Sequence, residues 1–525
     1  MIRELKQYAS MARQTGRFLR TPPIADARAD LLEKRGNRDA IFLEHARKLI
    51  FDVPSNPFHE MFHIAGCDYG TLAEEARRDG LERVLQKLYE AGVYLSHDEF
   101  KGKREIVRAG RHIRAGPESF SNPLILGGVV GSSSGSRSRG TPVRRNLDWQ
   151  LYREGLDRFL FPALGLERHT VVQLKAIMPA SYGLRRALTA SRMNQPQGAW
   201  FTLGGTVRNS AHYRVLTKLL ILSARWHGAT VPSPRYLPHN DFRGVARYLA
   251  ELKRQGRDRI LDTMVSQGVR VAAAAREHRL DISGTVFLVA GEALTDAKRA
   301  VIEEAGCTAL PCYLVSEIGF VGMACREMNK DNCVHMMDAH YAVISRRRKA
   351  PLCDLELDSL LFTTLASFLP FVLINAEMDD SGEIGPAPCD CPLSRFGYRR
   401  QIRNIYSYGK LTGQGTTLLS GDLLRILERT LPARFGGSPT DYQLVEIEGG
   451  SQTAIELRVH PRLNTAPAEE IKGFFLGEIK QMWGGALTGR EWTQTEGFRV
   501  VHGEPYMTRS GKVLPLHLLG FGGRI

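Results

Sequence analysis

The sequence Gly-Ser-Ser-Ser-Gly-Ser-Arg-Ser-Arg-Gly-Thr-Pro-Val fills residues 131–143, directly after an apolar segment at residues 123–130. This order indicates a strand that leads into a loop. Glycine lets the backbone N–H groups of such a loop turn toward an anion, serine hydroxyls donate further hydrogen bonds, and Arg137 and Arg139 add positive charge. The composition is typical of a phosphate-binding loop and also of a flexible Ser/Gly linker. It is not a Walker loop, because no Gly-Lys-Ser/Thr closes it.

The bulk composition indicates a soluble globular protein of more than one folding unit. A chain of 525 residues exceeds what one ordinary core supports, so we expect at least two units. Hydrophobic residues make up 43% and charged residues 24% of the chain, and no apolar run reaches the ~18 residues of a membrane span. The first 20 residues are basic without a continuous apolar segment, which favours a solvated helix over a transit peptide and does not fit a secretory signal. We expect a cytoplasmic protein.

The net charge is positive, with 71 Lys and Arg against 56 Asp and Glu and a formal value of +15. The excess is scattered, and only Arg-Arg-Arg-Lys at residues 346–349 forms a cluster. We find no zinc-finger spacing and no RNA-binding aromatic signature, so nucleic acid is not the expected partner. Small polyanions such as ATP or coenzyme A account for the sign of the charge equally well.

The order of apolar patterns predicts an α/β fold. Amphipathic helical patterns dominate residues 1–116. Strand-like and helical segments then alternate over residues 117–409, which predicts mixed or parallel sheets covered by helices. The clearest helix is expected at residues 147–164. The clearest strands are expected at residues 171–177, 198–203 and 286–290.

The composition changes near residues 406–415, which are polar and rich in glycine. Beyond this stretch we expect a small α+β domain over residues 410–525. Its predicted elements are a helix at residues 423–431, paired strands at residues 442–447 and 454–459, and a helix at residues 468–483.

Four short motifs carry a resemblance to a known family. They are Ser-Ser-Gly-Ser-Arg-Ser-Arg-Gly-Thr-Pro at residues 133–142, Gly-Glu-Ala-Leu-Thr at 291–295, Tyr-Leu-Val-Ser-Glu-Ile-Gly at 313–319, and Arg-Ser-Gly-Lys at 509–512. In this order they resemble the motifs of the adenylate-forming (acyl-CoA synthetase) superfamily, and in particular its phenylacetate-CoA ligase-like branch.

The resemblance implies a large N-terminal domain of mixed sheets covered by helices, and a small mobile α+β lid. It also implies an activity, in which a carboxylic acid, aromatic by resemblance, reacts with ATP to form an acyl-adenylate and pyrophosphate. The acyl group then passes to coenzyme A. Two alternatives stay open. One is transfer to a carrier-protein thiol, an amine or another small nucleophile, and the other is a nucleotide-binding module without turnover.

The resemblance also implies roles for individual residues. Lys512 would neutralise negative charge between the carboxylate and the α-phosphate, and Glu317 would hold Mg²⁺ through a hard oxygen ligand. The residues that would contact ATP are Ser133, Ser134, Gly135, Ser136, Arg137, Arg139, Gly140, Thr141, Gly291, Glu292, Tyr313, Ser316 and Asp379. The candidates for the acid pocket are Tyr182, Trp200, Phe201, Gly204 and Gly205, although these residues also fit an ordinary core.

Some positions depart from the family pattern. The glycine-rich loop is two residues longer, and Leu314 replaces a glycine. The ribose-binding aspartate is expected eight residues after Pro370, where Met378 stands, so we assign the role to Asp379 with a one-residue shift. The hinge motif is not recognisable at residues 405–410, which leaves the acceptor of the acyl group open.

Seven of the eight cysteines fall between residues 307 and 391, in a chain whose thiols we expect to be reduced. Relatives with the resembling motifs often carry Cys, Leu-His-Val and Cys-x-Cys after the glutamate motif. The corresponding residues here are Cys325, His335, Cys389 and Cys391, which together suit a structural Cys₃His zinc site. Cys333 is a competing ligand, and buried free thiols are the alternative to a metal site.

Overall fold

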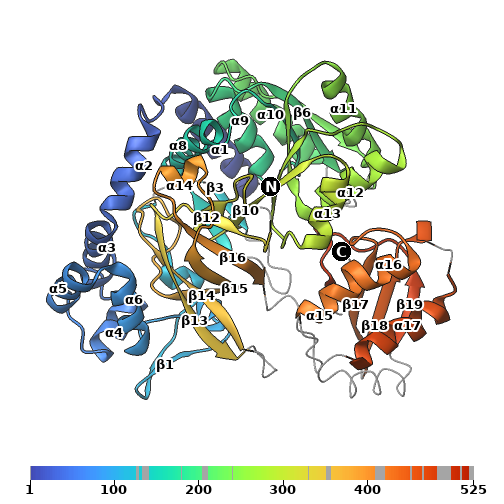
Figure 1. The fold of residues 1–525 in the computed structure, drawn as a ribbon. Helices are drawn as coiled ribbons and strands as arrows, with labels where there is room; N and C mark the ends of the chain where they lie inside the picture. The colour runs from blue at the N-terminus through green and yellow to red at the C-terminus, as the bar shows by residue number, and fades with distance from the viewer. Residues whose placement is uncertain are drawn as a thin grey trace.

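The structure is a computed structural model of the chain. It describes residues 2–125, 129–132, 141–178, 180–203, 211–238, 240–328, 330–349, 356–407, 420–449, 452–463, 466–481, 498–508 and 511–519. Within these ranges the chain forms a large α/β unit and a smaller unit near the C-terminus that has a sheet of its own (Figure 1).

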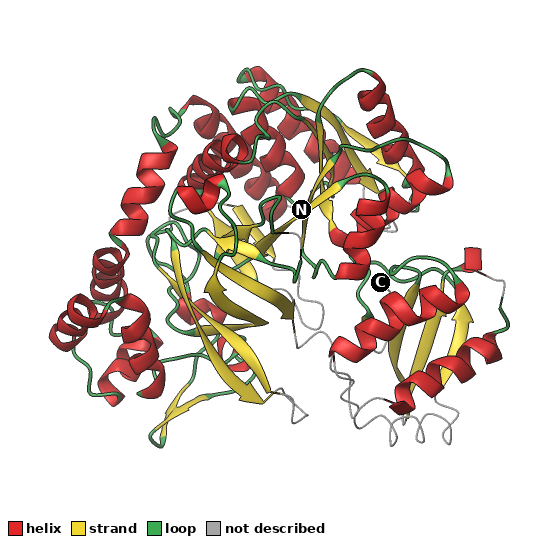
Figure 2. Ribbon diagram, viewed as in Figure 1, coloured by secondary structure: helices red, strands yellow, loops and turns green. Residues whose placement is uncertain are grey.

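A sheet of twelve strands runs through the large unit (Figure 2). Strands β10 to β7 pair in parallel, whereas strands β13 to β10 pair antiparallel. The predicted α/β fold with mixed pairing is therefore confirmed. In spatial order the strands are β13 (Tyr341–Lys349), β14 (Glu356–Thr364), β15 (Ala376–Pro386), β16 (Arg400–Ser407), β12 (Val334–Met336), β11 (Gly319–Met323), β10 (Thr308–Val315), β9 (Val286–Ala290), β8 (Arg259–Met264), β5 (Thr170–Leu174), β6 (Gln197–Leu203) and β7 (Pro234–Leu237).

Helices connect the parallel strands and bury their apolar faces against them. In α12, for example, Val265, Val269 and Ala272 are fully buried and belong to the same core cluster as residues of β8 and β9. Parallel strands need such crossover helices, and both faces of the sheet then become apolar. The helices of this part are α8 (Leu147–Ala163), α9 (Tyr182–Arg192), α10 (Ala211–Trp226), α11 (Arg243–Arg254), α12 (Val265–Glu277) and α13 (Asp296–Glu304), and α14 (Pro392–Arg395) follows β15.

The N-terminal region supplies helices and two short hairpins. Its core cluster joins α3 to α7 with strands β13 to β15, so the region packs against the antiparallel half of the sheet. Helix α1 lies apart from it, beside α10 and α8. The elements are α1 (Ile2–Arg20), α2 (Ala27–Gly36), α3 (Arg38–Ala46), η1 (Arg47–Phe51), α4 (Pro57–Ile64), α5 (Tyr69–Asp79), α6 (Leu81–Glu90), α7 (His97–Phe100), β1 (Ile106–Arg108), β2 (Arg111–Ile113), η2 (Pro117–Phe120), β3 (Val129–Ser132) and β4 (Pro142–Arg145).

The smaller unit has a four-stranded sheet in the order β19-β18-β17-β20. The two strands predicted to pair do so, antiparallel, as β17 and β18. The predicted helix at residues 423–431 is three consecutive helical segments. The elements are α15 (Ser420–Arg425), η4 (Ile426–Thr430), α16 (Leu431–Phe435), β17 (Tyr442–Gly449), β18 (Gln452–Val459), η5 (Pro461–Leu463), α17 (Ala468–Gln481), β19 (Phe498–His502) and β20 (Leu516–Leu519).

The smaller unit contacts α12 and α13 of the large one. Lys298 and Glu428 form a buried ion pair across the interface, with 2.8 Å between Nζ and Oε1. Arg270 donates through Nη2 to the Thr440 carbonyl at 3.3 Å. These contacts bring the C-terminal segment to the end of the parallel strands, which is where α/β proteins bind their ligands.

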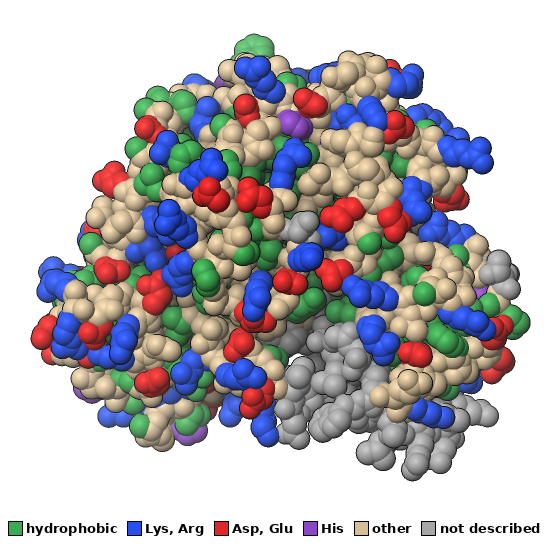
Figure 3. Space-filling model, viewed as in Figure 1, with side chains coloured by type: hydrophobic (Ala, Val, Ile, Leu, Met, Phe, Trp, Pro, Cys, Tyr) green, Lys and Arg blue, Asp and Glu red, His purple; other side chains and the backbone are tan. Residues whose placement is uncertain are grey.

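Two further observations bear on the composition. None of the helices in the described ranges combines the length and the hydropathy that a membrane crossing needs. Basic and acidic side chains are interspersed over the face seen in Figure 3, in keeping with the scattered charge of the sequence.

Candidate active site and metal centre

The first part of the candidate site is the turn between β10 and β11, which carries Glu317. This carboxylate is only 5% exposed, and Lys101 lies 3.1 Å away, measured from Nζ to Oε1. Lys101 also donates to the Thr141 hydroxyl at 2.5 Å. A buried carboxylate needs such a positive partner. The ammonium of Lys101 thus lies between two oxygens that a hard cation would also choose as ligands.

The neighbouring His97 opens helix α7 beside this pair. Burial, together with the positive charge of Lys101, lowers the pKa of His97 to about 4. The imidazole is therefore neutral near pH 7, and Lys101 is the cation that faces Glu317.

The second part is the turn after β9, where Gly291 and Glu292 meet the C-terminal segment. Gly291 has φ +86°, and a Cβ there would lie 2.9 Å from Lys512 Cε. Lys512 is 7% exposed. Val513 N donates to Ser266 Oγ at 2.9 Å, and Ser266 also contacts the Glu292 carboxylate. The structure thus brings the second and fourth motifs together although they lie more than 200 residues apart in the sequence.

The pKa of Glu292 reflects the balance of charges at this turn. Burial raises the pKa of this carboxyl group, while the charges of Lys298 and Lys512 and the hydrogen bond from Ser266 oppose the rise. Lys512 therefore contributes positive charge to a turn that otherwise buries a carboxylate. Glycine at position 291 is required here, because its positive φ and the close approach of the lysine exclude a side chain.

The third part joins β10 to β15. The Tyr313 hydroxyl donates to Asp380 Oδ2 at 2.8 Å. Asp379, the residue that we assigned to the ribose, has φ +65°, and its carbonyl accepts a hydrogen bond from Ser407 at 3.1 Å. The carboxylate that meets Tyr313 is therefore that of Asp380, which sequence spacing missed. Ser316 is placed by its carbonyl, which accepts from Arg145 Nη2 at 3.3 Å.

The acid-pocket candidates do not share one environment. Trp200 is 1% exposed, packs against Gly183, and donates through Nε1 to the Lys175 carbonyl at 2.9 Å. Phe201 belongs to a different core cluster, because successive side chains of β6 point to opposite faces of the sheet. Tyr182 is 38% exposed at the start of α9. Gly204 and Gly205 lie outside the described residues, as does the glycine-rich loop from Ser133 to Gly140.

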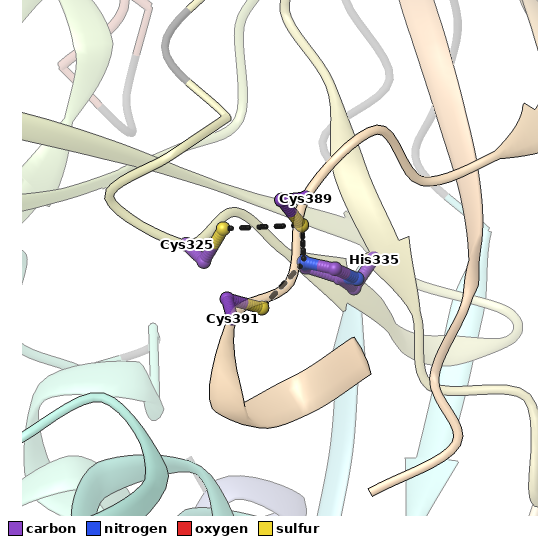
Figure 4. Close-up of side chains that lie close together, drawn as sticks. All are labelled: Cys325, His335, Cys389 and Cys391. Atoms are coloured by element: carbon purple, nitrogen blue, oxygen red, sulfur yellow. Dashed lines mark hydrogen bonds between the residues drawn. The ribbon is translucent and has the colours of Figure 1, made fainter. Parts of the chain in front are cut away.

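The metal-ligand candidates form a second, separate site, shown in Figure 4. We call the side chains of Cys325, His335, Cys389 and Cys391 the Cys/His group, whose ligand atoms all lie within 4.8 Å of one another. The separations are 3.7 Å from Cys325 Sγ to Cys389 Sγ, and 3.4 and 3.3 Å from His335 Nε2 to the sulfurs of Cys389 and Cys391. A tetrahedral zinc ion places such ligand atoms about 3.5–3.8 Å apart. The four residues therefore fit the ion that their sequence pattern suggested.

The surroundings of His335 support this arrangement. Its Nδ1 donates to the Tyr398 carbonyl at 2.8 Å, which leaves the Nε2 lone pair facing the sulfurs. Cys325, His335 and Cys391 are buried, so the site has little access to water. Cys333 is not part of the group; it is buried nearby, beside the charge of Arg299.

Sequence reasoning missed Lys101, Asp380, and two arginines that stack on Trp149. Lys101 ends a one-turn helix and carries no periodic signal. Arg145 and Arg185 differ from the many other arginines only in the rings that they contact, and that contact depends on the tertiary fold.

Solved structures with the same fold are known, although no protein-family model and no curated protein matches the sequence. A 2-hydroxyisobutyryl-CoA ligase in the postadenylation state, in complex with R3-HIB-AMP, aligns with a TM-score of 0.56 over 95% of this chain and 94% of its own, at 12% identity. The chain has the adenylate-forming ligase fold. The same ligase with 2-HIB-AMP and CoA aligns at 0.49 over 96% and 95%, at 14% identity. An ATP-bound RpMatB-BxBclM chimera aligns at 0.44 over 74% and 66%, at 11% identity.

Proposed function

We propose that this protein activates a carboxylic acid with ATP and then transfers the acyl group to coenzyme A. In the first step a carboxylate oxygen bonds to the α-phosphorus of ATP and pyrophosphate leaves. In the second step the coenzyme A sulfur bonds to the acyl carbon, AMP leaves, and the thiol proton passes to solvent. The adenylate-forming fold supports this assignment.

The observation that carries the proposal is the position of Lys512 beside the turn of Gly291 and Glu292. Tyr313 lies on β10, the next strand of the same sheet, and Glu317 follows that strand. Asp380 comes from the more distant strand β15 and meets Tyr313 through the hydrogen bond at 2.8 Å. A buried ammonium at this place stabilises negative charge that develops as pyrophosphate leaves.

Each part of the site then has a chemical task. Lys512 holds the α-phosphate and the attacking carboxylate together by charge. Glu317 would hold Mg²⁺, which would supply positive charge to the phosphate oxygens. Lys101, which now pairs with the Glu317 carboxylate, would have to give up that contact. Tyr313 and Asp380 bind the ribose end, next to the originally assigned Asp379. Thr141 closes a loop over residues 133–140 that binds the outer phosphates.

The remaining assignments follow from the same proposal. Residues 1–116 are the mainly helical N-terminal part of the large domain, and residues 117–409 are its core, which binds ATP and the acid. Residues 410–525 form the lid domain that carries Lys512. The Cys/His group holds a structural zinc ion, which ties the segment after Glu317 to the segment after β15. The acid is aromatic, by resemblance alone.

Pyrophosphate release from ATP and Mg²⁺ tests the proposal, measured over a panel of aromatic and aliphatic acids with and without coenzyme A. We expect release that depends on the acid, and a thioester when coenzyme A is present. Release without thioester would favour transfer to a carrier-protein thiol, an amine or another nucleophile, which the altered hinge sequence at residues 405–410 allows. ATP binding without release for any acid would leave a nucleotide-binding module.

A further inference from the structure

Cationic side chains gather where β5 and β8 end and α9 begins, and within the described part of the chain they outnumber the carboxylates that face them. The carboxylates are Asp157 and Asp262. Arg153 pairs with Asp157 at 2.7 Å, whereas Asp262 takes both Lys175 at 2.9 Å and Arg186 at 3.5 Å. The cations of the cluster are Arg145, Arg153, Lys175, Arg185 and Arg186.

Two of these guanidinium groups, Arg145 and Arg185, have no ion pair with any carboxylate of the described residues. Arg145 makes long hydrogen bonds, at 3.3 Å to the Ser316 carbonyl and 3.5 Å to the Tyr182 hydroxyl, and its Nε has no partner there. The Nε and Nη2 atoms of Arg185 are buried, and within the described ranges neither finds a hydrogen-bond acceptor.

Both groups stack on the same two rings. Arg145 Cζ lies 5.0 Å from the Trp149 centroid and 5.6 Å from that of Tyr182, and the Arg185 distances are 4.6 and 4.8 Å. Cation–π attraction offsets part of the cost of burying the charge. It supplies no acceptor to the N–H groups, however, and unsatisfied buried donors are costly.

The electrostatics of this cluster favour the binding of a negative charge. Burial, and then the charges of Arg145 and Arg153, lower the pKa of Arg185 to about 9. Removal of part of the Tyr182 side chain from water raises the pKa of its hydroxyl, but the charges of Arg145 and Arg185, followed by those of Lys175 and Arg153, lower it overall. Residues 133–140 between β3 and β4, and residues 204–210 after β6, contain no Asp or Glu and add three arginines. The two segments that adjoin β4 and β6 in the sequence therefore contain no carboxylate.

The position of the pair relative to Lys512 indicates what the anion belongs to. Lys512 lies at the end of β9, and β8 and then β5 follow it on one side of the sheet. Tyr313 and Asp380 lie on the other side, on β10 and β15. In the proposed function the reacting carboxylate lies at Lys512 and the ribose lies at Tyr313. The other end of the acid then extends away from the ribose, toward β5 and α9.

We propose that Arg145 and Arg185 bind a second anionic group of the acid, so that the substrate is a dianion. The group is a carboxylate, or a phosphate or sulfonate that also offers two acceptor oxygens, because a guanidinium donates two parallel hydrogen bonds to such a pair of oxygens. Trp149 and Tyr182 hold the two forks in place. That the dianion is the substrate of the reaction rests on the proposed function, whereas binding of the dianion at Arg145 and Arg185 does not depend on it.

Matched acids test it by acid-dependent pyrophosphate release: phenylacetate against 4-carboxyphenylacetate, and hexanoate against adipate. We expect kcat/KM to be at least tenfold higher for the dianion of at least one pair. Arg185→Gln should lower kcat/KM for that dianion at least tenfold and change the value for the matching monoanion by less than threefold. Arg247→Gln, at an exposed position of α11, is the control and should change neither.

Binding without ATP is the second readout. The preferred dianion should raise the Tm of the wild-type protein and of the Arg247→Gln control, but not that of Arg185→Gln. Without ligand, Arg185→Gln should have a Tm equal to or above that of wild type, because a buried unpaired charge has been removed. Should that variant fail to fold, Arg145→Gln takes its place in both measurements.

The outcomes separate this inference from the proposed function. Pyrophosphate release that is equal for mono- and dianions and insensitive to Arg185 would overturn the second anion site and leave the reaction intact. Loss of ATP binding in Arg185→Gln, with every acid affected equally, would assign the guanidinium groups to the phosphates and also overturn it. Arg185-dependent binding of a dianion without release for any acid would uphold the site and refute the reaction.

Discussion

The Cys/His group and the end of the parallel strands are both built from polar side chains, but they are satisfied in different ways. In the Cys/His group four ligand atoms face one another, and the outer nitrogen of His335 has a backbone partner. At the strand ends, Glu317 is held by Lys101, the residue directly after α7, and Arg145 and Arg185 face aromatic rings. The first arrangement suits an ion that stays in place, and the second suits charge that arrives with a ligand and leaves with the product.

Removing a ligand of the Cys/His group should have the largest effect. Cys391→Ser should abolish stoichiometric zinc and destabilise the protein by several kcal/mol, on the order of 5, because metal binding here is also folding free energy. Metal analysis of protein purified without chelator, and the Tm, are the measurements. Cys333→Ser replaces a buried thiol outside the group and should retain the metal. Equal zinc loss in both variants would contradict the ligand set.

The next largest effect is a pH dependence of stability that comes from His340 and not from His335, five residues before it. His335 belongs to the Cys/His group, whereas His340 is buried next to the Tyr152 hydroxyl, 2.8 Å from Nδ1, near the turn that follows Glu317. Burial, with the charge of Arg153, lowers the pKa of His340 to about 3. In the unfolded chain the imidazole of His340 therefore takes up a proton near pH 6.5, whereas in the folded protein it stays neutral down to a much lower pH. Stability contributed by the neutral imidazole is complete above pH 6.5 and is lost as the pH falls toward 3.

His340→Gln removes that pH-dependent contribution. The free energy of unfolding should fall less steeply between pH 7 and pH 4 in this variant, and the wild type should lose up to about 4 kcal/mol more over the full window. Chemical unfolding at a series of pH values measures the slope. His278→Gln, on the exposed end of α12, is the control and should keep the wild-type slope. Parallel slopes for all three proteins would refute the assignment.

Substitution of Lys512, which the smaller unit supplies, tests the candidate active site at the strand ends directly. Lys512→Ala should lower acid-dependent pyrophosphate release by about 10²–10³-fold, the usual cost of losing one transition-state charge partner. ATP binding should persist, because the proposed contacts with the outer phosphates and the ribose do not involve Lys512. Lys480→Ala, at an exposed position of α17, should be indistinguishable from wild type. Near-normal release by Lys512→Ala would remove the lysine from the mechanism.

The two regions also differ in how far the sequence foretold them. The four members of the Cys/His group were named from the sequence by resemblance, with Cys333 as a competing ligand, and the structure brings those four side chains together. Cys and His are typical zinc ligands, and the pair Cys389 and Cys391 has a local spacing that can be seen in the sequence. The α/β fold was predicted from the alternation of strand and helix patterns. Burial of one face of an element makes apolar residues recur at a regular spacing, and this spacing can be read from the sequence. Where an apolar strand runs straight into an apolar helix, as β8 does into α12 at Val265, that period does not mark the boundary.

The strand ends were foretold only in part. Spacing from a proline pointed to Asp379, yet the side chain on Tyr313 is that of Asp380. The physical cause is local backbone geometry, since Asp379 has a positive φ and β15 shifts register against both of its neighbours. A count of residues assumes regular alternation and cannot detect such a shift. The guanidinium pair was missed because the rings that Arg145 and Arg185 contact come together only in the tertiary fold.

Substitution of Lys101 should have the smallest effect, and it tests whether the charge at the strand ends gives way to an arriving cation. If the ammonium holds a place that a cation takes over, Lys101→Gln should free Glu317 and Thr141 and remove a positive charge from the site. The Mg²⁺ concentration for half-maximal pyrophosphate release, at saturating ATP, should then fall about threefold, which corresponds to under about 1 kcal/mol. Lys103→Gln is the matched control, two residues away and paired with Asp98 at the surface. A higher Mg²⁺ requirement in Lys101→Gln would mean that the lysine supports the phosphates together with the ion, and that this charge is a permanent part of the site.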